Sequence, residues 1–464
     1  MENQPRETLG SRLGFILLSA GCAIGLGNVW RFPWLVGQNG GAVFVLIYLV
    51  FLLLLGIPVM TMEFAMGRAS RKSPLHMYGA LAPEKRAWSW HGPVCFAANY
   101  LLMMFYTTVC GWMVLYFAKF ATGQLSGLAP AEVGAAFGAM LGDPVLLCTA
   151  MALVVVAGFF ILSMGLRAGL ERVTKAMMLL LLAMMVVLAV NSCFLKGGAE
   201  GVAFYLKPDL GRFLHAEGGP GRVCVNAMNQ AFFTLSLGIG SMAIFGSYIG
   251  KERSLPGESL HVTLLDTFVA VVAGLIIFPA CFAYNGGETG AGPGLIFVTL
   301  PNVFNAMPGG RLWGTLFFAF MTFAAFSTVL AVCENILAMT MDRTGWPRQR
   351  ACAACSGLLF LLSLPCALGF NLLSGFHPMG GGSNVLDLED FIVSNLLLPA
   401  GALLFSLFCC HRFGWGWENF VAEANTGRGP KIRPWMRFYC AWIVPAIVLA
   451  ILLLGLWDKF GPKG

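Results

Sequence analysis

Eleven apolar runs, each long enough to cross a lipid bilayer, make up most of this 464-residue chain. About 20 apolar residues form a helix that spans the hydrocarbon core. The composition agrees, because 58% of the residues are hydrophobic and only 11% are charged, whereas soluble domains have about 45–50% and about 25%. A water-soluble enzyme is therefore excluded, and we expect an all-α polytopic membrane protein. The predicted spans are 13–36, 41–66, 94–120, 143–164, 170–194, 223–248, 260–284, 311–341, 350–371, 386–410 and 436–457.

Lys and Arg residues gather in the segments that would lie on one side of the membrane. With the N-terminal tail 1–12 inside, the inner segments hold 20 of the 29 Lys and Arg residues. Cytoplasmic loops carry such an excess, so we expect a cytoplasmic N-terminus. The net charge of +7 follows from these loops, and no nucleic-acid partner is expected.

Two of the predicted spans are interrupted by small residues at equivalent places. Span 1 contains Gly21-Cys-Ala-Ile-Gly-Leu-Gly-Asn28, and span 6 contains Thr234-Leu-Ser-Leu-Gly-Ile-Gly240. Each begins a block of five spans, 13–194 and 223–410, and because five is odd the second block has the opposite topology. Such paired interruptions indicate an inverted-repeat transporter with its site at the midplane, followed by an eleventh helix at 436–457. Close helix packing is the alternative explanation of the small residues.

Interrupted helices free carbonyl oxygens that can hold a hard cation such as Na⁺, and half-helix N-termini favour a carboxylate. Neutral side-chain oxygens lie nearby, on Asn28, Thr234, Ser236, Ser327 and Thr328; alternatively, each hydroxyl bonds back to its own helix. Charges within spans are costly and mark function or buried hydrogen bonds. The charged residues that matter here are Glu63, Asp266 and Glu334 inside spans, with Arg31, Asp387 and Asp390 at the outer ends.

At these residues the sequence resembles the neurotransmitter:sodium symporter family, and in particular its bacterial leucine and multi-hydrophobic amino-acid transporters. The motifs that carry the resemblance are Arg12-Leu-Gly14, Gly21 to Pro33, Asn39-Gly-Gly41, Gly56-Ile-Pro58, Glu63 to Arg68 and Gln230 to Gly238. The resemblance implies a leucine-transporter-like fold with a 5+5 inverted repeat and broken helices 1 and 6. It also implies a sodium-coupled symporter in the bacterial cytoplasmic (inner) membrane.

The resemblance further implies two sodium sites, a substrate site and two gates. The sodium ligands would come from Gly21, Ala23, Ile24, Asn28, Thr234, Asp266, Ala324, Ser327 and Thr328. The substrate site would comprise Cys22, Ala23, Gly25, Gly27, Leu102, Tyr106, Phe233, Thr234, Ser236, Ile239, Thr328 and Val332, with Tyr106 bound to the substrate carboxylate and Phe233 as a lid. The outer gate would pair Arg31 with Asp390, and the inner gate would pair Arg6 with Asp342.

The substrate class follows from what is absent at Gly25, where amine-carrying members of the family have an aspartate. The substrate must then bring its own carboxylate, and the largely apolar pocket suits a neutral, hydrophobic amino acid. Chloride should not be required, because Asp266 can supply the negative charge that chloride provides in animal members. Tyr48 and Gln230 match other residues around that chloride site, whereas Ala270 replaces the acid that bacterial relatives often have there.

Proton coupling and amine transport remain as alternatives within the same fold. A non-transporting amino-acid receptor would need an output domain, which is not visible in the sequence. An intramembrane enzyme is disfavoured, because the six histidines lie in or near loops without a catalytic spacing, and no catalytic residue is expected. The particular amino acid, the sodium stoichiometry and the oligomeric state do not follow from the sequence.

Overall fold

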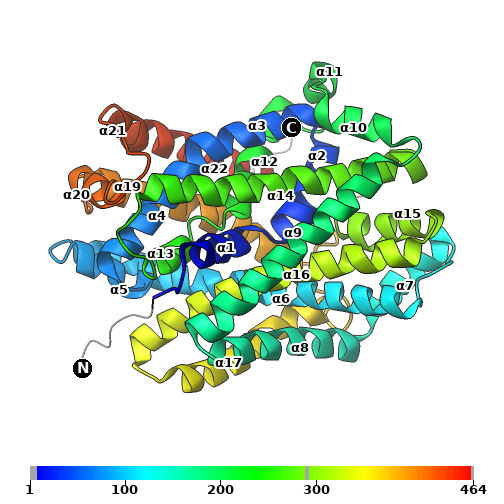
Figure 1. Ribbon diagram of the computed structural model, residues 1–464, viewed down its shortest axis with the longest axis horizontal. Coiled ribbons are helices and arrows are strands. Elements are labelled where there is room, and N and C mark those ends of the chain that lie inside the picture. Colours follow the sequence, from blue (N-terminus) through cyan, green and yellow to red (C-terminus); the bar gives the residue numbers. More distant parts are fainter. Residues whose placement is uncertain (1–7, 288–291, 461–464) are drawn as a thin grey trace.

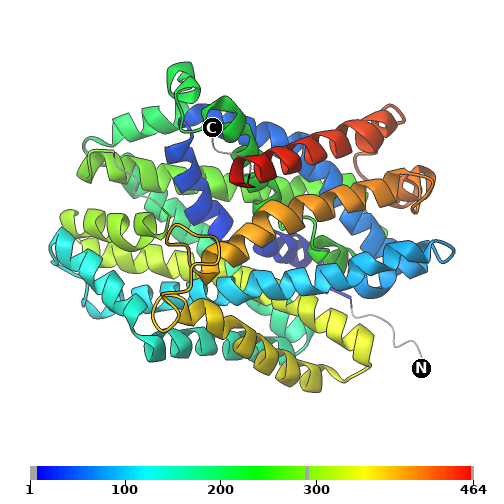
Figure 2. The ribbon, with the colours of Figure 1, turned by 180° about the vertical axis from the view of Figure 1, so that it is seen from behind.

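The computed structural model describes residues 8–287 and 292–460, and within these ranges every long element is a helix. An isolated β-bridge joins Arg253 to Arg428 in two loops. Most of the long helices run from left to right in Figure 1 and, seen from behind, in Figure 2. The short helices α7, α10 and α15 lie towards the right-hand end of Figure 1 and α11 lies at the top, whereas α5, α20 and α21 lie at the left-hand end.

Nine helical stretches of the described chain are long and apolar enough to cross a membrane unbroken. Each overlaps a span predicted from the sequence, so the fold class is confirmed. They are Ala42–Ser70 (Ala42–Phe51, α3, and Ile57–Ser70, α4), Arg86–Thr122 (containing His91–Thr122, α6), Pro144–Ser163 (α8), Leu166–Cys193 (containing Arg172–Cys193, α9), Leu255–Tyr284 (α14), Gly310–Thr344 (α16), Arg348–Leu368 (α17), Val385–Cys410 (Val385–Phe391, α18, and Leu398–Cys410, α19) and Met436–Trp457 (Met436–Phe438, α21, and most of Val444–Phe460, α22).

The two remaining spans are the ones that small residues were expected to interrupt. The first consists of Arg12–Ala23 (α1) and Gly27–Gln38 (a π-helical turn and α2), which meet at an angle of 52°. The second consists of Gly219–Thr234 (α12) and Ser241–Gly246 (α13), with the non-helical segment 235–240 between them. Broken helices 1 and 6 of a 5+5 inverted repeat are therefore present.

Shorter helices connect the spans and complete the described chain. They are Pro74–Leu81 (α5), Pro130–Gly142 (α7), Gly198–Leu206 (α10), Leu210–Leu214 (α11), Leu300–Ala306 (α15) and Trp417–Ala424 (α20). Within the bundle, α6 packs along α16, α8 along α17, and α9 along both α14 and α16. The broken helix α1 is surrounded by α9, α14 and α16, so its interruption lies inside protein rather than in lipid. Irregular backbone is tolerated in a membrane in that setting.

Backbone geometry explains why the second interruption needs small residues. Ser236, Gly238 and Gly240 all have positive φ angles, of 51°, 95° and 75°. A Cβ atom at Gly238 would lie 2.1 Å from the carbonyl oxygen of Leu398, so only glycine allows α19 to approach this closely. The segment is also held from outside, because its Gly238 N–H donates to the buried Glu63 carboxylate over 2.6 Å. Asn99 of α6 donates a further hydrogen bond of 2.9 Å to the carbonyl of Ile239.

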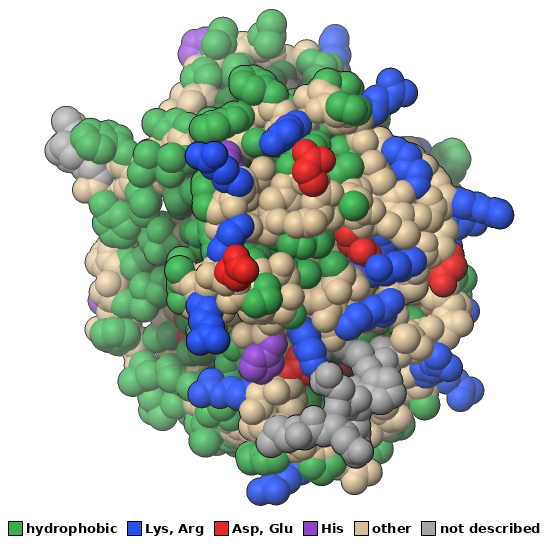
Figure 3. Space-filling model, turned by 90° about the vertical axis from the view of Figure 1, so that its left-hand side faces the viewer, with side chains coloured by type: hydrophobic (Ala, Val, Ile, Leu, Met, Phe, Trp, Pro, Cys, Tyr) green, Lys and Arg blue, Asp and Glu red, His purple; other side chains and the backbone are tan. Residues whose placement is uncertain are grey.

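The basic segments that were expected on one side of the membrane do meet one another. Figure 3 shows that Lys and Arg side chains far outnumber Asp and Glu on the left-hand end of the molecule. There the Lys85 ammonium group donates to the carbonyl of Gly414 over 2.6 Å, and Ser73 N–H donates to Asp342 over 2.8 Å. These contacts join segments 67–93, 342–350 and 411–437, which the sequence predicts on one side of the membrane.

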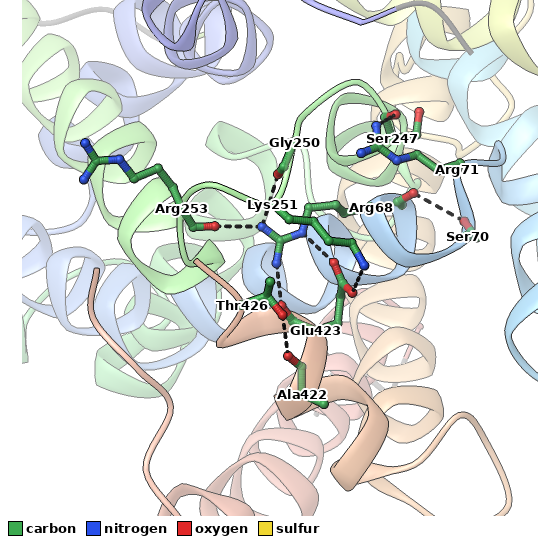
Figure 4. A network of polar contacts seen from close by, with 11 residues as sticks. Arg68, Ser70, Arg71, Ser247, Gly250, Lys251, Arg253, Ala422, Glu423 and Thr426 are labelled. Carbon is green, nitrogen blue, oxygen red and sulfur yellow. Dashed lines mark hydrogen bonds and ion pairs between the residues drawn. The ribbon is translucent and has the colours of Figure 1, made fainter. Parts of the chain in front are cut away.

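At the same end, a buried ion pair fastens α4 to α20. The Arg68 guanidinium, at the end of α4, has no exposed surface and lies 2.6 Å from Glu423 Oε1. It also donates to the carbonyls of Arg253, at 2.7 Å, and of Glu423. Figure 4 shows the guanidinium enclosed by these acceptors, with the half-exposed Lys251 also reaching the Glu423 carboxylate.

Candidate functional site

Five oxygen atoms converge where α1 ends, and we call them the Ser327 cluster: the carbonyls of Gly21, Ile24 and Ala324 and the hydroxyls of Ser327 and Thr328. The Ser327 hydroxyl oxygen lies 3.2 Å from Gly21 O, 3.4 Å from Ile24 O and 2.9 Å from Ala324 O. The Thr328 hydroxyl oxygen lies 3.2, 3.3 and 3.5 Å from the same three carbonyls.

The Ser327 cluster has more acceptors than protons. Two hydroxyl groups supply two protons for six close oxygen–oxygen contacts, so most of the lone pairs that face one another are not satisfied by hydrogen bonds. Around a hard cation with ligands at about 2.4 Å, neighbouring oxygens at right angles are about 3.4 Å apart. The five oxygen atoms of the Ser327 cluster and the distances between them therefore fit the coordination of a dehydrated Na⁺ ion.

A second polar cluster joins the two broken helices to α14. The Asn28 amide donates to Asp266 Oδ1 over 2.8 Å, and the Thr234 hydroxyl lies 3.2 Å from both carboxylate oxygens. All three side chains are fully buried. The Asn28 amide oxygen in turn accepts from the N–H of Gly25 over 3.2 Å. One carboxylate is thus surrounded by neutral oxygen and amide groups, which is the setting expected for the other sodium ligands.

Beside these clusters lies a small cavity with a volume of about 10 Å³. A space of about 10–15 Å³ holds about one water molecule, so the side chains around the cavity nearly close it in this conformation. The cavity is lined by Cys22, Ala23, Gly27, Leu102, Tyr106, Phe233, Ser236, Thr328 and Leu398. Its wall is mostly apolar, and its polar groups come from Tyr106, Ser236 and Thr328.

Eight of the expected substrate-site residues line this cavity, and four do not. Gly25 and Thr234 lie next to it, against Tyr106 and Asp266 respectively. Ile239 and Val332 are fully buried but are not part of the lining, so their assignment remains a prediction. Leu398 of α19 lines the cavity and was not expected, because no local pattern in the tenth span distinguishes this leucine from its neighbours.

Gly25 is packed against the polar end of the cavity. A Cβ atom there would lie 2.1 Å from the Tyr106 hydroxyl oxygen and 2.4 Å from the Thr328 hydroxyl oxygen. The Tyr106 oxygen also accepts the backbone N–H of Leu26, at 2.8 Å. There is consequently no room for a carboxylate side chain at this position.

The two residues of the expected outer gate lie close together and next to the ring of Phe233. Arg31 Nη1 lies 3.4 Å from Asp390 Oδ1 and donates to the Ser394 hydroxyl over 2.6 Å. Ser394 in turn donates to Asp390 over 2.7 Å. The Arg31 guanidinium also sits 4.5 Å from the centroid of the Phe233 ring, a cation–π distance. Ser394 was missed, although its spacing of four residues from Asp390 on one helix pointed to it.

The expected inner gate is only partly described, because Arg6 lies outside the described residues. Asp342 accepts the backbone N–H of Ser73. The start of α1 is held instead by Glu171, which accepts from Gly10 N–H over 2.7 Å and from the Ser11 hydroxyl over 2.9 Å. Arg12 forms an ion pair of 3.0 Å with the buried Glu258. Glu171 and Glu258 follow basic residues in short segments that the sequence predicts on the inner side. In the sequence they therefore resembled ordinary charged residues of a loop.

Glu334, an acid expected within a span, lies away from the cavity lining. Its Oε1 atom accepts from the Tyr248 hydroxyl over 2.9 Å and from Arg348 over 3.2 Å. The Arg348 side chain also donates to the carbonyl of Leu162 over 2.7 Å. Glu334 therefore joins α8, α16 and α17 in a buried hydrogen-bonded ion pair.

Comparison with known proteins agrees with this geometry. Residues 6–129 and 138–462 match the profile of the Sodium:neurotransmitter symporter family. The chain is 37% identical to the sodium-dependent transporter YhdH of Bacillus subtilis, over 98% of both chains, and 29% identical to a sodium-dependent transporter of Haemophilus influenzae, over 98% and 99%. The crystal structure of MhsT in complex with L-phenylalanine is similar, with a TM-score of 0.86 and 37% identity over 97% of this chain and 100% of that one.

Proposed function

The chain belongs to the sodium:neurotransmitter symporter family, and we propose that it couples Na⁺ entry to the uptake of a neutral, hydrophobic L-amino acid by alternating access. It is a sodium-dependent transporter and not an enzyme. The observation that carries the amino-acid proposal is the packing at Gly25, which leaves no space for a carboxylate that would neutralise an amine. A substrate that brings its own carboxylate supplies that charge instead.

The groups around the cavity support this substrate class. The Tyr106 hydroxyl can donate to a substrate carboxylate while it accepts from Leu26 N–H, because a phenol has one proton and a free lone pair. The apolar lining from Leu102, Phe233 and Leu398 favours a substrate side chain without charge. MhsT, which has the same fold and 37% identity, was crystallised with L-phenylalanine.

Two Na⁺ ions are proposed as co-substrates. The Ser327 cluster would hold one ion through three carbonyls and two hydroxyls. Asn28, Thr234, Asp266 and the carbonyl of Ala23 would hold the other together with the substrate carboxylate. In this arrangement two cations face two carboxylates, those of Asp266 and of the substrate, while helix carbonyls hold the substrate ammonium group. Asp266 would thus supply the negative charge for which chloride would otherwise be needed.

The basic end of the molecule is proposed to face the cytoplasm. Figure 3 views this end, where Lys and Arg side chains far outnumber Asp and Glu. Basic segments of the chain contact one another: Lys85 donates to Gly414 O, Lys251 pairs with Glu423, and Ser254 N–H donates to Arg428 O. An excess of Lys and Arg favours the cytoplasmic side. The cavity would then open outward past Arg31 and Asp390, and inward past the start of α1. The membrane proposed is the bacterial cytoplasmic membrane, in keeping with the bacterial relatives.

The test is uptake of radiolabelled amino acids into proteoliposomes that contain the purified protein, with and without an inward Na⁺ gradient. The panel contains leucine, methionine, phenylalanine, tyrosine and tryptophan, with tryptamine as the matched amine that lacks the carboxylate of tryptophan. We expect sodium-stimulated uptake of at least one amino acid and none of tryptamine. Uptake of tryptamine, stimulation by a proton gradient alone, or binding without uptake would each favour one of the alternatives and refute the proposal.

A further inference from the structure

We propose that Leu398 of α19 is a specificity-determining residue that limits the size of the substrate side chain. This inference rests on the proposed function. The other residues that line the cavity come from the broken helices and from α6 and α16, whereas Leu398 comes from the tenth span. The side chain is 1% exposed and forms part of the apolar wall.

Local structure fixes the position of Leu398. A π-helical turn, Ile392–Leu397, ends directly before Leu398, and the backbone N–H of Leu398 donates to the carbonyl of Val393. Such a turn shifts the register of the residues that follow it, and π-helical turns are frequent at functional sites. Pro399 comes next and cannot donate a backbone hydrogen bond. The orientation of the Leu398 side chain at the start of α19 therefore depends on an irregular turn rather than on a continuous α-helix.

The backbone around Leu398 is also wedged against the non-helical segment 235–240. The carbonyl oxygen of Leu398 lies 2.1 Å from where a Cβ of Gly238 would be, and a Cβ at Gly401 would lie 1.8 Å from Gly238 O. Two glycines thus let the two backbones touch over one turn of α19. Since Gly238 is itself held by Glu63, this part of the cavity wall cannot shift independently of the broken helix.

The same span carries the outer gate. Asp390 lies eight residues before Leu398, and Ser394 lies four residues before it. Both side chains bind Arg31, whose guanidinium lies over the ring of Phe233. A side chain that pushed Leu398 outward would displace the segment that carries the two gate residues. With the gate closed, Leu398 is consequently a rigid wall. A rigid apolar wall discriminates by size, and one methylene in such a pocket changes affinity by about 10–200-fold.

The experiment measures sodium-stimulated binding of radiolabelled leucine, phenylalanine and tryptophan to the purified full chain in detergent. The variants are Leu398→Ala, which widens the pocket, and Leu398→Phe, which narrows it. Leu396→Ala is the matched control, because Leu396 lies in the same π-helical turn, is half-exposed and does not line the cavity. We expect the ratio of tryptophan to leucine affinity to rise at least tenfold in Leu398→Ala, to fall in Leu398→Phe, and to stay constant in the control.

A purely structural role for Leu398 would weaken all three amino acids by the same factor, and that result overturns the inference. An unchanged rank order with intact binding also overturns it. Leu398→Val serves as a milder widening variant if Leu398→Phe does not yield a monodisperse protein, and it should raise the same ratio by a smaller factor. If the wild-type protein binds none of the panel, the proposed function fails first, so the two failures are distinguishable.

Discussion

A Cβ atom added at Gly25 would lie only 2.1 Å from the hydroxyl oxygen of Tyr106. The hydroxyl cannot withdraw without losing its hydrogen bond of 2.8 Å from Leu26 N–H. Gly25→Ala should therefore lower the affinity for every amino-acid substrate at least tenfold, as measured by sodium-dependent radioligand binding. Gly134→Ala is the control, because nothing lies within 4 Å of a Cβ at that helical glycine. Wild-type affinity in Gly25→Ala would contradict a substrate contact with Tyr106.

Sodium dependence should collapse when the oxygen ligands are removed. The combined change of Ser327→Ala and Thr328→Ala deletes both hydroxyls of the Ser327 cluster, and Asn28→Ala deletes the amide beside Asp266. Hydrogen bonds to charged groups contribute about 1.5–3 kcal/mol, so the Na⁺ concentration at half-saturation should rise roughly tenfold or more. Thr322→Ala is the control, since its hydroxyl donates to the carbonyl of Phe318 in its own helix. Unchanged half-saturation in both variants would refute the ligand assignment.

The Asp266 carboxylate should make chloride dispensable. Uptake by the wild-type protein should be the same in sodium chloride and in sodium gluconate. Asp266→Asn keeps the size and the contact with Thr234 but removes the charge, so transport should be strongly impaired or become dependent on chloride. A large loss of wild-type uptake in gluconate would refute the first expectation. An Asp266→Asn protein that matches wild type in both salts would leave the carboxylate without a role.

Glu171 should hold the inner half of the first broken helix in place. Glu171→Ala removes the acceptor of Gly10 N–H and of the Ser11 hydroxyl, and Ser11 itself caps α1 by accepting from Gly14 N–H over 2.9 Å. Each of these two hydrogen bonds to a charged group contributes about 1.5–3 kcal/mol. Amide hydrogen exchange over 8–14 should then accelerate at least tenfold. Glu200→Ala, at an exposed position in α10, should leave it unchanged, and equal exchange in both variants would contradict the prediction.

The buried Arg68–Glu423 pair should matter far more for stability than an exposed pair of the same type. Arg68→Ala leaves a buried carboxylate with only the partly exposed Lys251, and breaking a buried ion pair costs about 3–5 kcal/mol. The midpoint of thermal unfolding in detergent should fall clearly. Arg437→Ala breaks the exposed pair with Glu418, where the side chains are 62% and 83% exposed, and should change the midpoint little. Equal shifts would refute the burial argument.

The irregular backbone at the centre of this protein was predictable, because local residue types encode it. The glycines between Gly21 and Gly27, and again at Gly238 and Gly240, mark two places where a helix cannot continue unbroken. The apolar spans predict the membrane crossings, and their Lys and Arg pattern predicts which loops meet. The resemblance to a family then indicated which residues of other spans lie beside the two interruptions. The structure brings Asn28, Thr234 and Asp266 together, and it also brings Ser327 and Thr328 to the carbonyls of α1.

Only the tertiary structure could decide which side chains from distant spans complete the site. Leu398 enters the cavity because a π-helical turn rotates α19 and two glycines let it touch the sixth span, whereas Ile239 lies outside the cavity lining and offers its carbonyl to Asn99. Glu171 binds Gly10 across 161 positions in sequence. Such contacts depend on the rotation and register of packed helices, to which every neighbouring side chain contributes. A break in a helix is a local property of the chain, but the residue that faces the break is a property of the whole bundle.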